Sequence, residues 1–285
     1  MENSLRLTER AMQAAAQSAT SSPLSKVIFI IVILVALYYL YQFLFASSDM
    51  LGQIVLKNIV SASPGTAYTA TVGTTEGTIP APLAGGEYTV NTWVYVNDYS
   101  VNRGQNKNIL TLGGTSFATL AVFLGPYKNT LSVRVKTDDT NTGELSSSGL
   151  ATLFSTLQSG SSLLDISKPC DINGIDLQKW VQVTVVLNNK TCDVYMDGKL
   201  ARSCILPSFF RVDKSSTMMS ICDYKGFGGY VSNTSAYNYA LNPEQVWRLF
   251  MSGPGPQYTF LQYVAALFDP KATLAVGYPK QNITG

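Results

Sequence analysis

The chain of 285 residues contains no histidine. This absence excludes catalysis by a Ser-His or Cys-His pair, zinc ligation by imidazole and general-base chemistry at an imidazole ring. An enzyme built from this sequence would have to work with carboxylates alone.

Charged residues are also scarce, at 13% of the chain, and the net charge is only +2. A balance of this kind gives no electrostatic footprint for nucleic acid, so we expect no nucleic-acid partner. The surface must instead carry Ser, Thr, Asn, Gln and Tyr. Such a neutral polar surface is typical of a lumenal or extracellular module, or of a subunit packed into a larger assembly.

One long stretch has no formal charge at all, Val27 to Ala46. As a helix it would extend about 30 Å, roughly the hydrocarbon thickness of a bilayer. We therefore expect a polar leader over residues 1–26 and a transmembrane helix over 27–46, with the lipid bilayer as a partner. The alternatives are a buried core helix and a cleaved signal peptide, whose apolar region is usually shorter.

Flanking positive charge predicts the orientation of this span. Arg6, Arg10 and Lys26 precede it, whereas only Lys57 follows it before residue 100. Cytoplasmic flanks carry the excess of Lys and Arg, so the sequence predicts a single-pass membrane protein with its N-terminus inside.

Four cysteines occur, and none has the CxxC spacing of a zinc or redox site. Cys192 and Cys204 lie symmetrically about Gly198, in the stretch TCDVYMDGKLARSC. Asp-Gly is a hairpin turn signal, so a three-residue loop would set the two cysteines opposite one another. A Cys192–Cys204 disulfide and a set of buried free thiols, with Cys170 and Cys222, both stay open.

The remainder reads as a strand-rich domain. Residues 47–79 are rich in Ser, Thr, Ala, Pro and Gly and predict a stalk and a first strand. From Glu87 onward, short runs alternate with period two between turn residues, and one helix is marked by Asn242 as N-cap, Pro243 at its first position and Gly253 at its end. Many short strands with a single helix predict an all-β antiparallel sandwich or jelly roll.

The order of four segments carries a family resemblance: EYTVNTWVYVND, NILTLGG, KWVQVTVVLNNKTCDVYMDGKLARS and GYVSNTSAYNYALNPEQVWRLF. Together they resemble the concanavalin A-like lectin/glucanase superfamily in its laminin G-like form, over roughly residues 80–252. The resemblance implies two antiparallel sheets packed face to face. It also implies that Trp93 and Trp180 are core residues rather than sugar platforms.

Catalytic and metal-binding signals are weak. The ExDxxE strand of the glucanase branch is missing and Glu87, Glu144 and Glu244 are isolated, so we expect no enzyme, no catalytic residue and no cofactor. Calcium is the one conceivable ion, although turn formation and capping explain the aspartates better. The possible oxygen donors are Asp138, Asp139, Asp165, Asp171, Asp176 and Asp223. Five aromatic residues could either stack on a sugar or lie in the core or an interface: Tyr224, Phe227, Tyr230, Tyr237 and Tyr239.

Three glycosylation sequons begin at Asn189, Asn233 and Asn282. Residues 253–285 follow the domain as a C-terminal arm that includes an apolar stretch, Phe260 to Phe268, too short to cross a bilayer. The arm would pack on the sandwich, on a neighbouring subunit or at a membrane surface.

These features predict a non-catalytic structural protein whose membrane anchor tethers a sandwich to a neighbouring protein layer. The layout resembles a membrane-anchored minor capsid protein of a large icosahedral DNA virus, which implies the virion membrane beneath a capsid and capsid subunits as partners. The competing function is a cell-surface glycan- or receptor-binding lectin, with a glycoside hydrolase as the third alternative.

Overall fold

The computed structural model describes residues 23–45, 52–63, 67–138, 143–157 and 170–255. The chain divides into two compact units, Met1–Leu51 and Gly52–Gly285. Within the described residues, the first unit contains one helix, and the second contains all the strands and two further α-helices. The leader residues 1–22 and the arm residues 256–285 lie outside the described residues.

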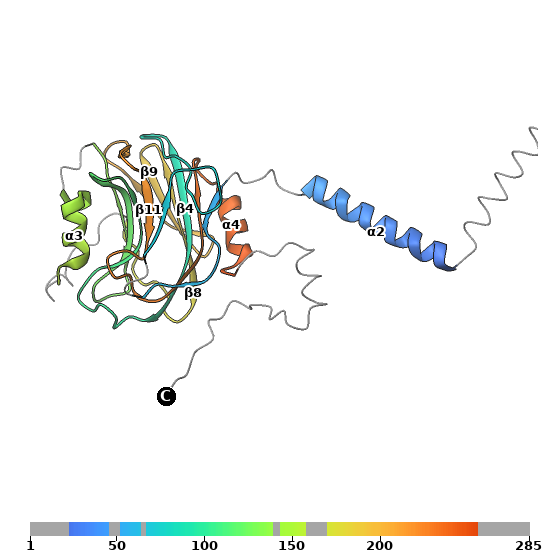
Figure 1. Cartoon of the computed structure of the whole chain (residues 1–285), viewed down its shortest axis with the longest axis horizontal. Helices are drawn as coiled ribbons and strands as arrows, with labels where there is room; N and C mark the ends of the chain where they lie inside the picture. Colours follow the sequence, from blue (N-terminus) through green and yellow to red (C-terminus); the bar gives the residue numbers. More distant parts are fainter. Residues whose placement is uncertain (1–22, 46–51, 64–66, 139–142, 158–169, 256–285) are drawn as a thin grey trace, which may run out of the picture. The chain divides into compact units, whose positions relative to one another are not determined.

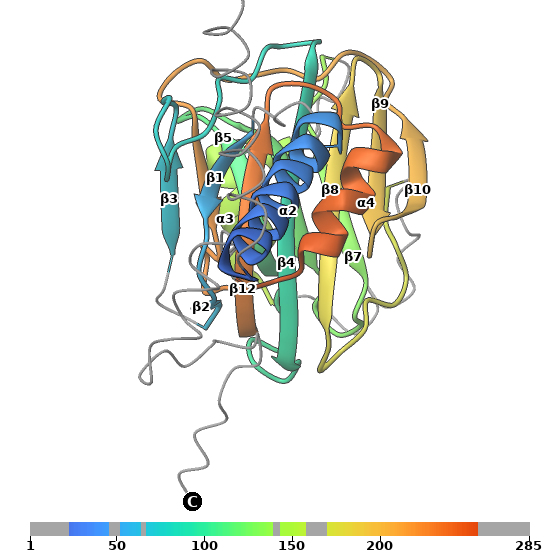
Figure 2. The same ribbon diagram turned by 90° about the vertical axis from the view of Figure 1, so that its right-hand side faces the viewer.

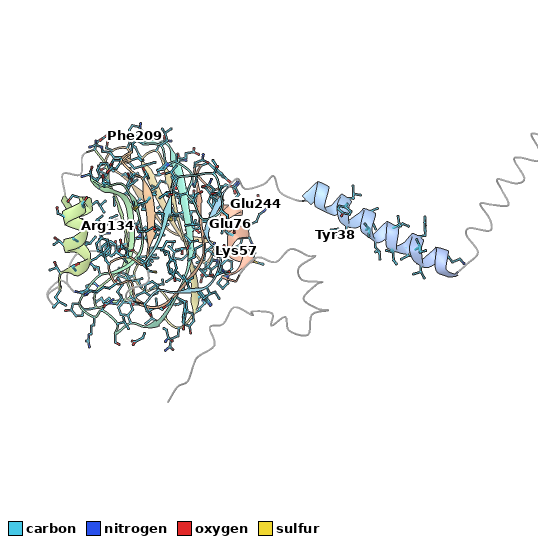
Figure 3. All side chains as sticks on the ribbon, viewed as in Figure 1. Tyr38, Lys57, Glu76, Arg134, Phe209 and Glu244 are labelled. Carbon is cyan, nitrogen blue, oxygen red and sulfur yellow. A yellow bond between two sulfur atoms is a disulfide. The ribbon has the colours of Figure 1, made fainter. Side chains whose placement is uncertain are left out.

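The first unit contains α2, Pro23–Phe45, so the apolar run is helical as predicted, with its start before Val27. Figure 3 shows side chains, Tyr38 among them, projecting from all sides of this helix. The large apolar side chains between Val27 and Leu40 are exposed. Within the described residues, no helix combines the length and the hydropathy needed to cross a membrane. The span predicted for 27–46 is therefore not confirmed.

Two antiparallel sheets form the second unit (Figure 1). The seven-stranded sheet has the order β1-β12-β4-β8-β9-β10, with β2 also paired to β12. Its strands are β1 (Gln53–Leu56), β2 (Val60–Ser61), β4 (Glu87–Asp98), β8 (Trp180–Asn188), β9 (Thr191–Met196), β10 (Lys199–Ile205) and β12 (Gly228–Tyr237). The five-stranded sheet has the order β3-β11-β5-β6-β7. Its strands are β3 (Tyr68–Thr71), β5 (Lys107–Gly113), β6 (Ala118–Leu124), β7 (Leu131–Val135) and β11 (Met218–Ile221). The predicted all-β sandwich is confirmed.

The core lies between the two sheets and follows the period-two alternation of the strands. Tyr88, Val90, Val94 and Val96 of β4 belong to one buried cluster with side chains from both sheets. Leu110, Leu112, Leu120, Val122, Leu131, Val133, Val183 and Val185 are further members of that cluster. The odd-numbered residues at the centre of β4 point to the opposite face of the seven-stranded sheet, which leaves a second surface to be covered.

Helix α4, Pro243–Ser252, covers part of that second surface (Figures 1 and 2). The Asn242 side chain accepts from the Gln245 N–H while the Gln245 side chain accepts from the Asn242 N–H, which makes a capping box. The Phe250 ring stacks on Trp93 of β4 with 5.7 Å between centroids. The predicted cap at Asn242, first-turn Pro243 and end at Gly253 are confirmed.

A second helix on the sandwich, α3 (Ser147–Ser155), corrects the expectation of a single one. It follows a short 3-10 turn, η1 (Gly143–Leu145), and its N-cap Ser146 accepts from the Gly149 N–H. Phe154 of α3 meets Phe123 of β6 edge to face at 5.5 Å, so α3 covers the outer face of the five-stranded sheet. Its Ser- and Gly-rich sequence reads as a loop, and burial of Leu150 and Phe154 stabilises the helix instead.

The boundary expected at residue 80 also needs correction. Residues 53–71, expected in the stalk and first strand, supply β1, β2 and β3 to the two sheets. Val55 and Leu56 of β1 and Val60 of β2 pack against the core cluster, so the sandwich begins at Gln53.

Candidate ligand-binding groove

A groove of about 640 Å³ lies on the outer face of the seven-stranded sheet, where β8 begins and α4 ends. Two strands and the segment after α4 form its walls. The lining residues are Tyr95, Gln178, Lys179, Trp180, Ser252, Gly253, Pro254 and Gly255. This volume lies within the range of small-molecule sites.

The Tyr95 and Trp180 rings line one side of the groove, and Tyr230 continues this aromatic row beyond it. Trp180 of β8 and Tyr230 of β12 are both cross-strand partners of Tyr95 on β4. The Tyr95 ring centroid lies 5.4 Å from that of Trp180 and 6.2 Å from that of Tyr230. Because a strand places alternate side chains on one face, this row is a direct consequence of the strand register. The row gives the groove an apolar wall with phenolic hydroxyls beside it.

The tryptophans were expected in the core, and the structure refines that expectation. Trp93 and Trp180 are buried, with 4% and 8% of their surfaces exposed. Both nevertheless lie outside the cluster between the sheets. Trp93 is covered by Phe250, whereas Trp180 lines the groove.

The opposite side of the groove is main chain held in place by β12. Gly253 ends α4 with φ of 78°, a conformation that favours glycine. The Asn233 side-chain amide donates to the Gly253 carbonyl at 3.0 Å, and the Ser232 hydroxyl donates to the Pro254 carbonyl at 2.5 Å. These two bonds fix residues 253–255 as a rim facing the aromatic row.

Polar side chains stand at the mouth of the groove. Gln178 is exposed, and its backbone N–H donates to the Val96 carbonyl at 2.8 Å, which fixes its position beside β4. The Lys179 ammonium lies 3.1 Å from an Asp176 oxygen and 3.5 Å from an Asp197 oxygen. The hydrogen bond to Asp176 and the charge of Asp197 raise the pKa of Lys179, so it stays protonated. The mouth thus offers an amide and a cation with paired carboxylates.

A second, smaller hollow of about 450 Å³ lies near Phe209, which Figure 3 labels. Phe209 is 45% exposed, and the Lys190 ammonium sits 4.9 Å from its ring centroid. Arg211 pairs with Asp138 at 3.1 Å in the same hollow. This smaller hollow offers one exposed aromatic ring, Phe209, so the groove beside α4 is the better candidate for a binding site.

The possible calcium ligands do not gather within the described residues. Asp171 pairs with Arg134, and the carboxylate of Asp223 accepts from the Tyr224 N–H. Asp138 pairs with Arg211 in the smaller hollow, and Asp176 pairs with Lys179 at the mouth of the groove. Asp139 and Asp165 lie outside the described residues. Each described aspartate of this set has a local structural role.

The three glutamates also have separate roles. The Glu87 carboxylate accepts from the Ala240 N–H, Glu144 lies 3.5 Å from Arg134, and Glu244 lies 2.6 Å from Arg248. A glycosidase requires two carboxylates on either side of one glycosidic bond. The described residues do not bring any two of these three together.

None of the five aromatics that were candidates for sugar stacking lines the groove, although Tyr230 contacts the Tyr95 ring beside it. Phe227 is fully buried in the core. Tyr224 stacks on Phe154 of α3 at 5.0 Å, and Tyr237 meets Tyr239 edge to face. The sequence did not indicate Gln178 and Lys179, although two exposed polar residues directly before a strand-initiating tryptophan were the available signal.

The three sequons have different outcomes. Asn189 is exposed in the turn between β8 and β9. Asn233 is only 9% exposed and its amide is bonded to the Gly253 carbonyl, so the suggestion of glycosylation there is corrected. Asn282 lies outside the described residues.

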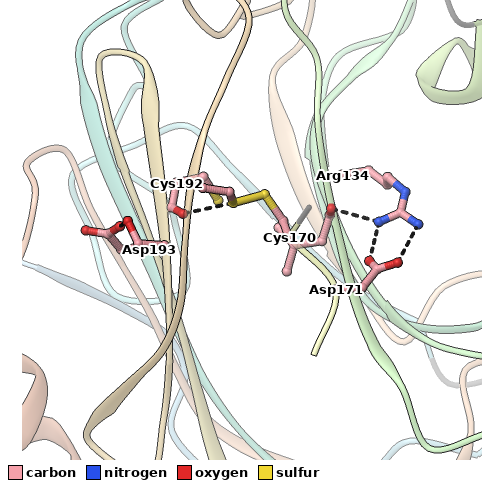
Figure 4. Close-up of a disulfide and its surroundings, with 8 residues drawn as sticks. Arg134, Cys170, Asp171, Cys192 and Asp193 are labelled. Atoms are coloured by element: carbon pink, nitrogen blue, oxygen red, sulfur yellow. Dashed lines mark hydrogen bonds and ion pairs between the residues drawn. A yellow bond between two sulfur atoms is a disulfide. The ribbon is translucent and has the colours of Figure 1, made fainter. Parts of the chain in front are cut away.

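The predicted cysteine pair is opposed across the hairpin but not bonded. The expected three-residue loop is wrong, because Asp197 and Gly198, both with positive φ, make a two-residue turn. A bulge after Leu200 then brings Cys204 opposite Cys192. The disulfide instead joins Cys204 to Cys170, as Figure 4 shows. Cys204 points into the sandwich, where Cys170 reaches it from another segment, and sequence spacing does not contain that information. Cys192 and Cys222 are buried free thiols.

A family model described as the concanavalin A-like lectin/glucanases superfamily, Laminin_G_3, matches residues 69–247. No curated protein matches the sequence.

Solved structures similar to this chain include three binding domains of larger proteins. That of Paraclostridial Mosquitocidal Protein 1 is 16% identical with a TM-score of 0.44, covering 72% of this chain and 47% of that one. That of botulinum neurotoxin serotype G is 14% identical with a TM-score of 0.43 and the same coverage. That of botulinum neurotoxin DC, in complex with rat synaptotagmin II, is 15% identical with a TM-score of 0.39, covering 61% and 37%. The chain spans less than half the length of the solved chains that it matches.

Proposed function

Because the chain belongs to the concanavalin A-like lectin/glucanase superfamily, we propose that its sandwich is a non-catalytic module that binds carbohydrate in the groove beside α4. The observation that carries this proposal is the pair of aromatic rings, Trp180 and Tyr95, that lines the groove together with a fixed main-chain rim. An aromatic face packs against the apolar face of a pyranose ring, and nearby polar groups select its hydroxyls.

The groups at the mouth suit a neutral or acidic sugar. Gln178 can donate and accept hydrogen bonds, and the Lys179 ammonium can donate to a hydroxyl or a carboxylate. The non-catalytic part of the proposal rests on the missing histidine and on the separation of Glu87, Glu144 and Glu244.

Gln178→Ala tests the groove without disturbing the core, because this side chain is exposed. We expect apparent affinity for a glycan identified on an array to fall about fivefold, as loss of one hydrogen bond of about 1 kcal/mol predicts. Binding of the full chain in mild detergent is measured on the array and then by calorimetry, with and without a calcium chelator. The matched control is Asn173→Ala, an exposed amide outside the groove, which should bind normally. If no glycan binds, or if both variants weaken binding equally, the groove is not the site.

A second candidate function follows from α2. Its exposed apolar side chains favour attachment of the chain to a membrane. The flanking positive charges favour an N-terminus inside. We propose that the attached sandwich acts as a structural tether to a neighbouring protein layer such as a capsid. Membranes or particles that contain the full chain should retain it through alkaline carbonate extraction. Chemical cross-linking should then join the sandwich to other protein subunits at fixed stoichiometry. Release by carbonate would contradict the anchor, and a lone uncross-linked species would contradict the tether.

A further inference from the structure

Three of the four cysteines meet at one point inside the sandwich (Figure 4). Cys170 precedes β8, Cys192 lies on β9 and Cys204 lies on β10, and their sulfur atoms are all within 4.8 Å of one another. Cys170 and Cys204 form the disulfide, while Cys192 keeps a free thiol. The Cys204 sulfur also lies 3.1 Å from the Cys192 carbonyl oxygen. A free thiol is therefore packed against a disulfide in the described structure.

The disulfide joins the edges of the two sheets. Cys204 belongs to β10, the outermost strand of the seven-stranded sheet. Two residues after Cys170, Ile172 exchanges two backbone hydrogen bonds, of 2.8 and 2.9 Å, with Leu131 of β7. Strand β7 is the outermost strand of the five-stranded sheet. The Cys170–Cys204 bond thus closes one open side of the sandwich covalently.

We propose that Cys192 is the nucleophile of an internal thiol–disulfide exchange that moves the bond from Cys170–Cys204 to Cys192–Cys204. Cys192 and Cys204 are direct cross-strand partners in β9 and β10, so the product lies within a single hairpin. Exchange begins when the Cys192 thiolate attacks the Cys204 sulfur. One S–S bond forms as the other breaks, and Cys170 leaves as a thiolate that takes up the proton lost by Cys192. The step needs no external oxidant or reductant.

The exchange changes what the covalent bond holds together. Before it, the bond joins two sheets through Ile172 and β7. After it, the bond joins two strands that are already hydrogen-bonded neighbours, and the edge near Ile172 is held by non-covalent contacts alone. Local opening at Leu131 and Ile172 should become more frequent in the product.

We expect the exchange to be slow, because the Cys192 thiol is rarely ionised. Burial, with a smaller contribution from the Asp193 carboxylate, raises the pKa of Cys192 to about 12. Only the thiolate attacks a disulfide, so the reactive fraction is small near neutral pH. Uncatalysed disulfide rearrangement takes minutes to hours, and the test must cover that range.

Peptide mapping by mass spectrometry without reduction tests the proposal. The purified full chain is incubated for up to a day without added thiol, quenched in acid and alkylated. We expect a Cys192–Cys204 peptide to accumulate as the Cys170–Cys204 peptide declines, together with faster amide exchange at Leu131 and Ile172. Cys192→Ser should abolish this change. The matched control Cys222→Ser removes the other buried thiol, which lies outside the described three-sulfur cluster, and should leave it intact.

A second variant keeps the proposal falsifiable if the exchange is very slow. Cys170→Ser leaves Cys192 and Cys204 as the only opposed pair, and mild oxidation of this variant should join them. Two alkylated thiols in that variant would show that the hairpin cannot take the bond. In the unsubstituted chain, a persistent Cys170–Cys204 peptide alone, or conversion to Cys170–Cys192, would also overturn the proposal.

Discussion

The Cys170→Ala/Cys192→Ala double variant should unfold with a free energy about 3–4 kcal/mol below that of the single variant Cys192→Ala. The single variant keeps the Cys170–Cys204 disulfide, whose cysteines are 34 residues apart. Closing a loop of this length restricts the unfolded chain by roughly that amount in the chain-entropy description. The comparison isolates the disulfide because both variants lack the thiol that takes part in exchange.

Tryptophan fluorescence during urea unfolding measures this difference. Trp93, Trp180 and Trp247 all lie in the sandwich, so the signal reports on that unit of the full chain. Adding dithiothreitol should lower the stability of Cys192→Ala to that of the double variant. Equal stability of the two variants under oxidising conditions would show that the bond between the sheets does not constrain the unfolded chain.

Replacing Asp213 with Ala should cost about 3 kcal/mol of folding stability, because its buried carboxylate joins two loops. One oxygen accepts from the backbone N–H groups of Ser116 and Phe117, at 2.7 and 3.3 Å, just before β6. The other accepts from the backbone N–H and the hydroxyl of Ser215, ahead of β11. A hydrogen bond to a charged group contributes about 1.5–3 kcal/mol, and truncation leaves several donors without their partner.

The stability that Asp213 contributes should depend on pH. Burial raises the pKa of this carboxyl, but the hydrogen bonds from Ser215, Ser116 and Phe117 outweigh it and hold the pKa well below its usual value. The folded state therefore binds fewer protons than the unfolded state, in which the aspartate has a pKa of about 3.9. The contribution is complete well above that pH and declines as the pH falls below it.

Asp213→Asn provides the measurement, since the amide cannot titrate. The stability gap between the unsubstituted chain and this variant should be constant from pH 7 to about 5 and should narrow toward pH 2. Glu76→Gln, at an exposed position, serves as the control and should change stability by less than about 0.5 kcal/mol. A gap that widens in acid would contradict the assignment of these hydrogen bonds to an ionised carboxylate.

Local pattern was enough to predict several elements of this protein. The alternation in β4 and β8 determined which residues face the core, since a strand places successive side chains on opposite faces. Asn242, Pro243 and Gly253 determined both ends of α4, because capping depends on a few adjacent residues. Asp197 and Gly198 determined the position of the hairpin turn, whereas the opposition of Cys192 and Cys204 also depends on the bulge after Leu200.

Tertiary structure alone decided the features that depend on contacts between distant segments. Helix α3 forms because Leu150 and Phe154 are buried against β6, and the sequence of the helix does not indicate that contact. The groove exists because Trp180 and Tyr95 share the face on which α4 ends.

The cysteines show the same division most clearly. The hairpin pattern predicted that Cys192 and Cys204 lie on neighbouring strands and oppose each other, but the opposition arises from a two-residue turn and a bulge rather than from the expected three-residue loop. Pairing depends on which sulfur atoms come together in space, and Cys170 arrives from a segment that only packing of the two sheets brings to β10. Local sequence was sufficient to predict the strands, the caps of α4 and the position of the hairpin turn, because those follow from interactions within a few residues. Folding of the sheets onto each other decided the disulfide, the covering helix and the groove, because each joins residues that are far apart along the chain.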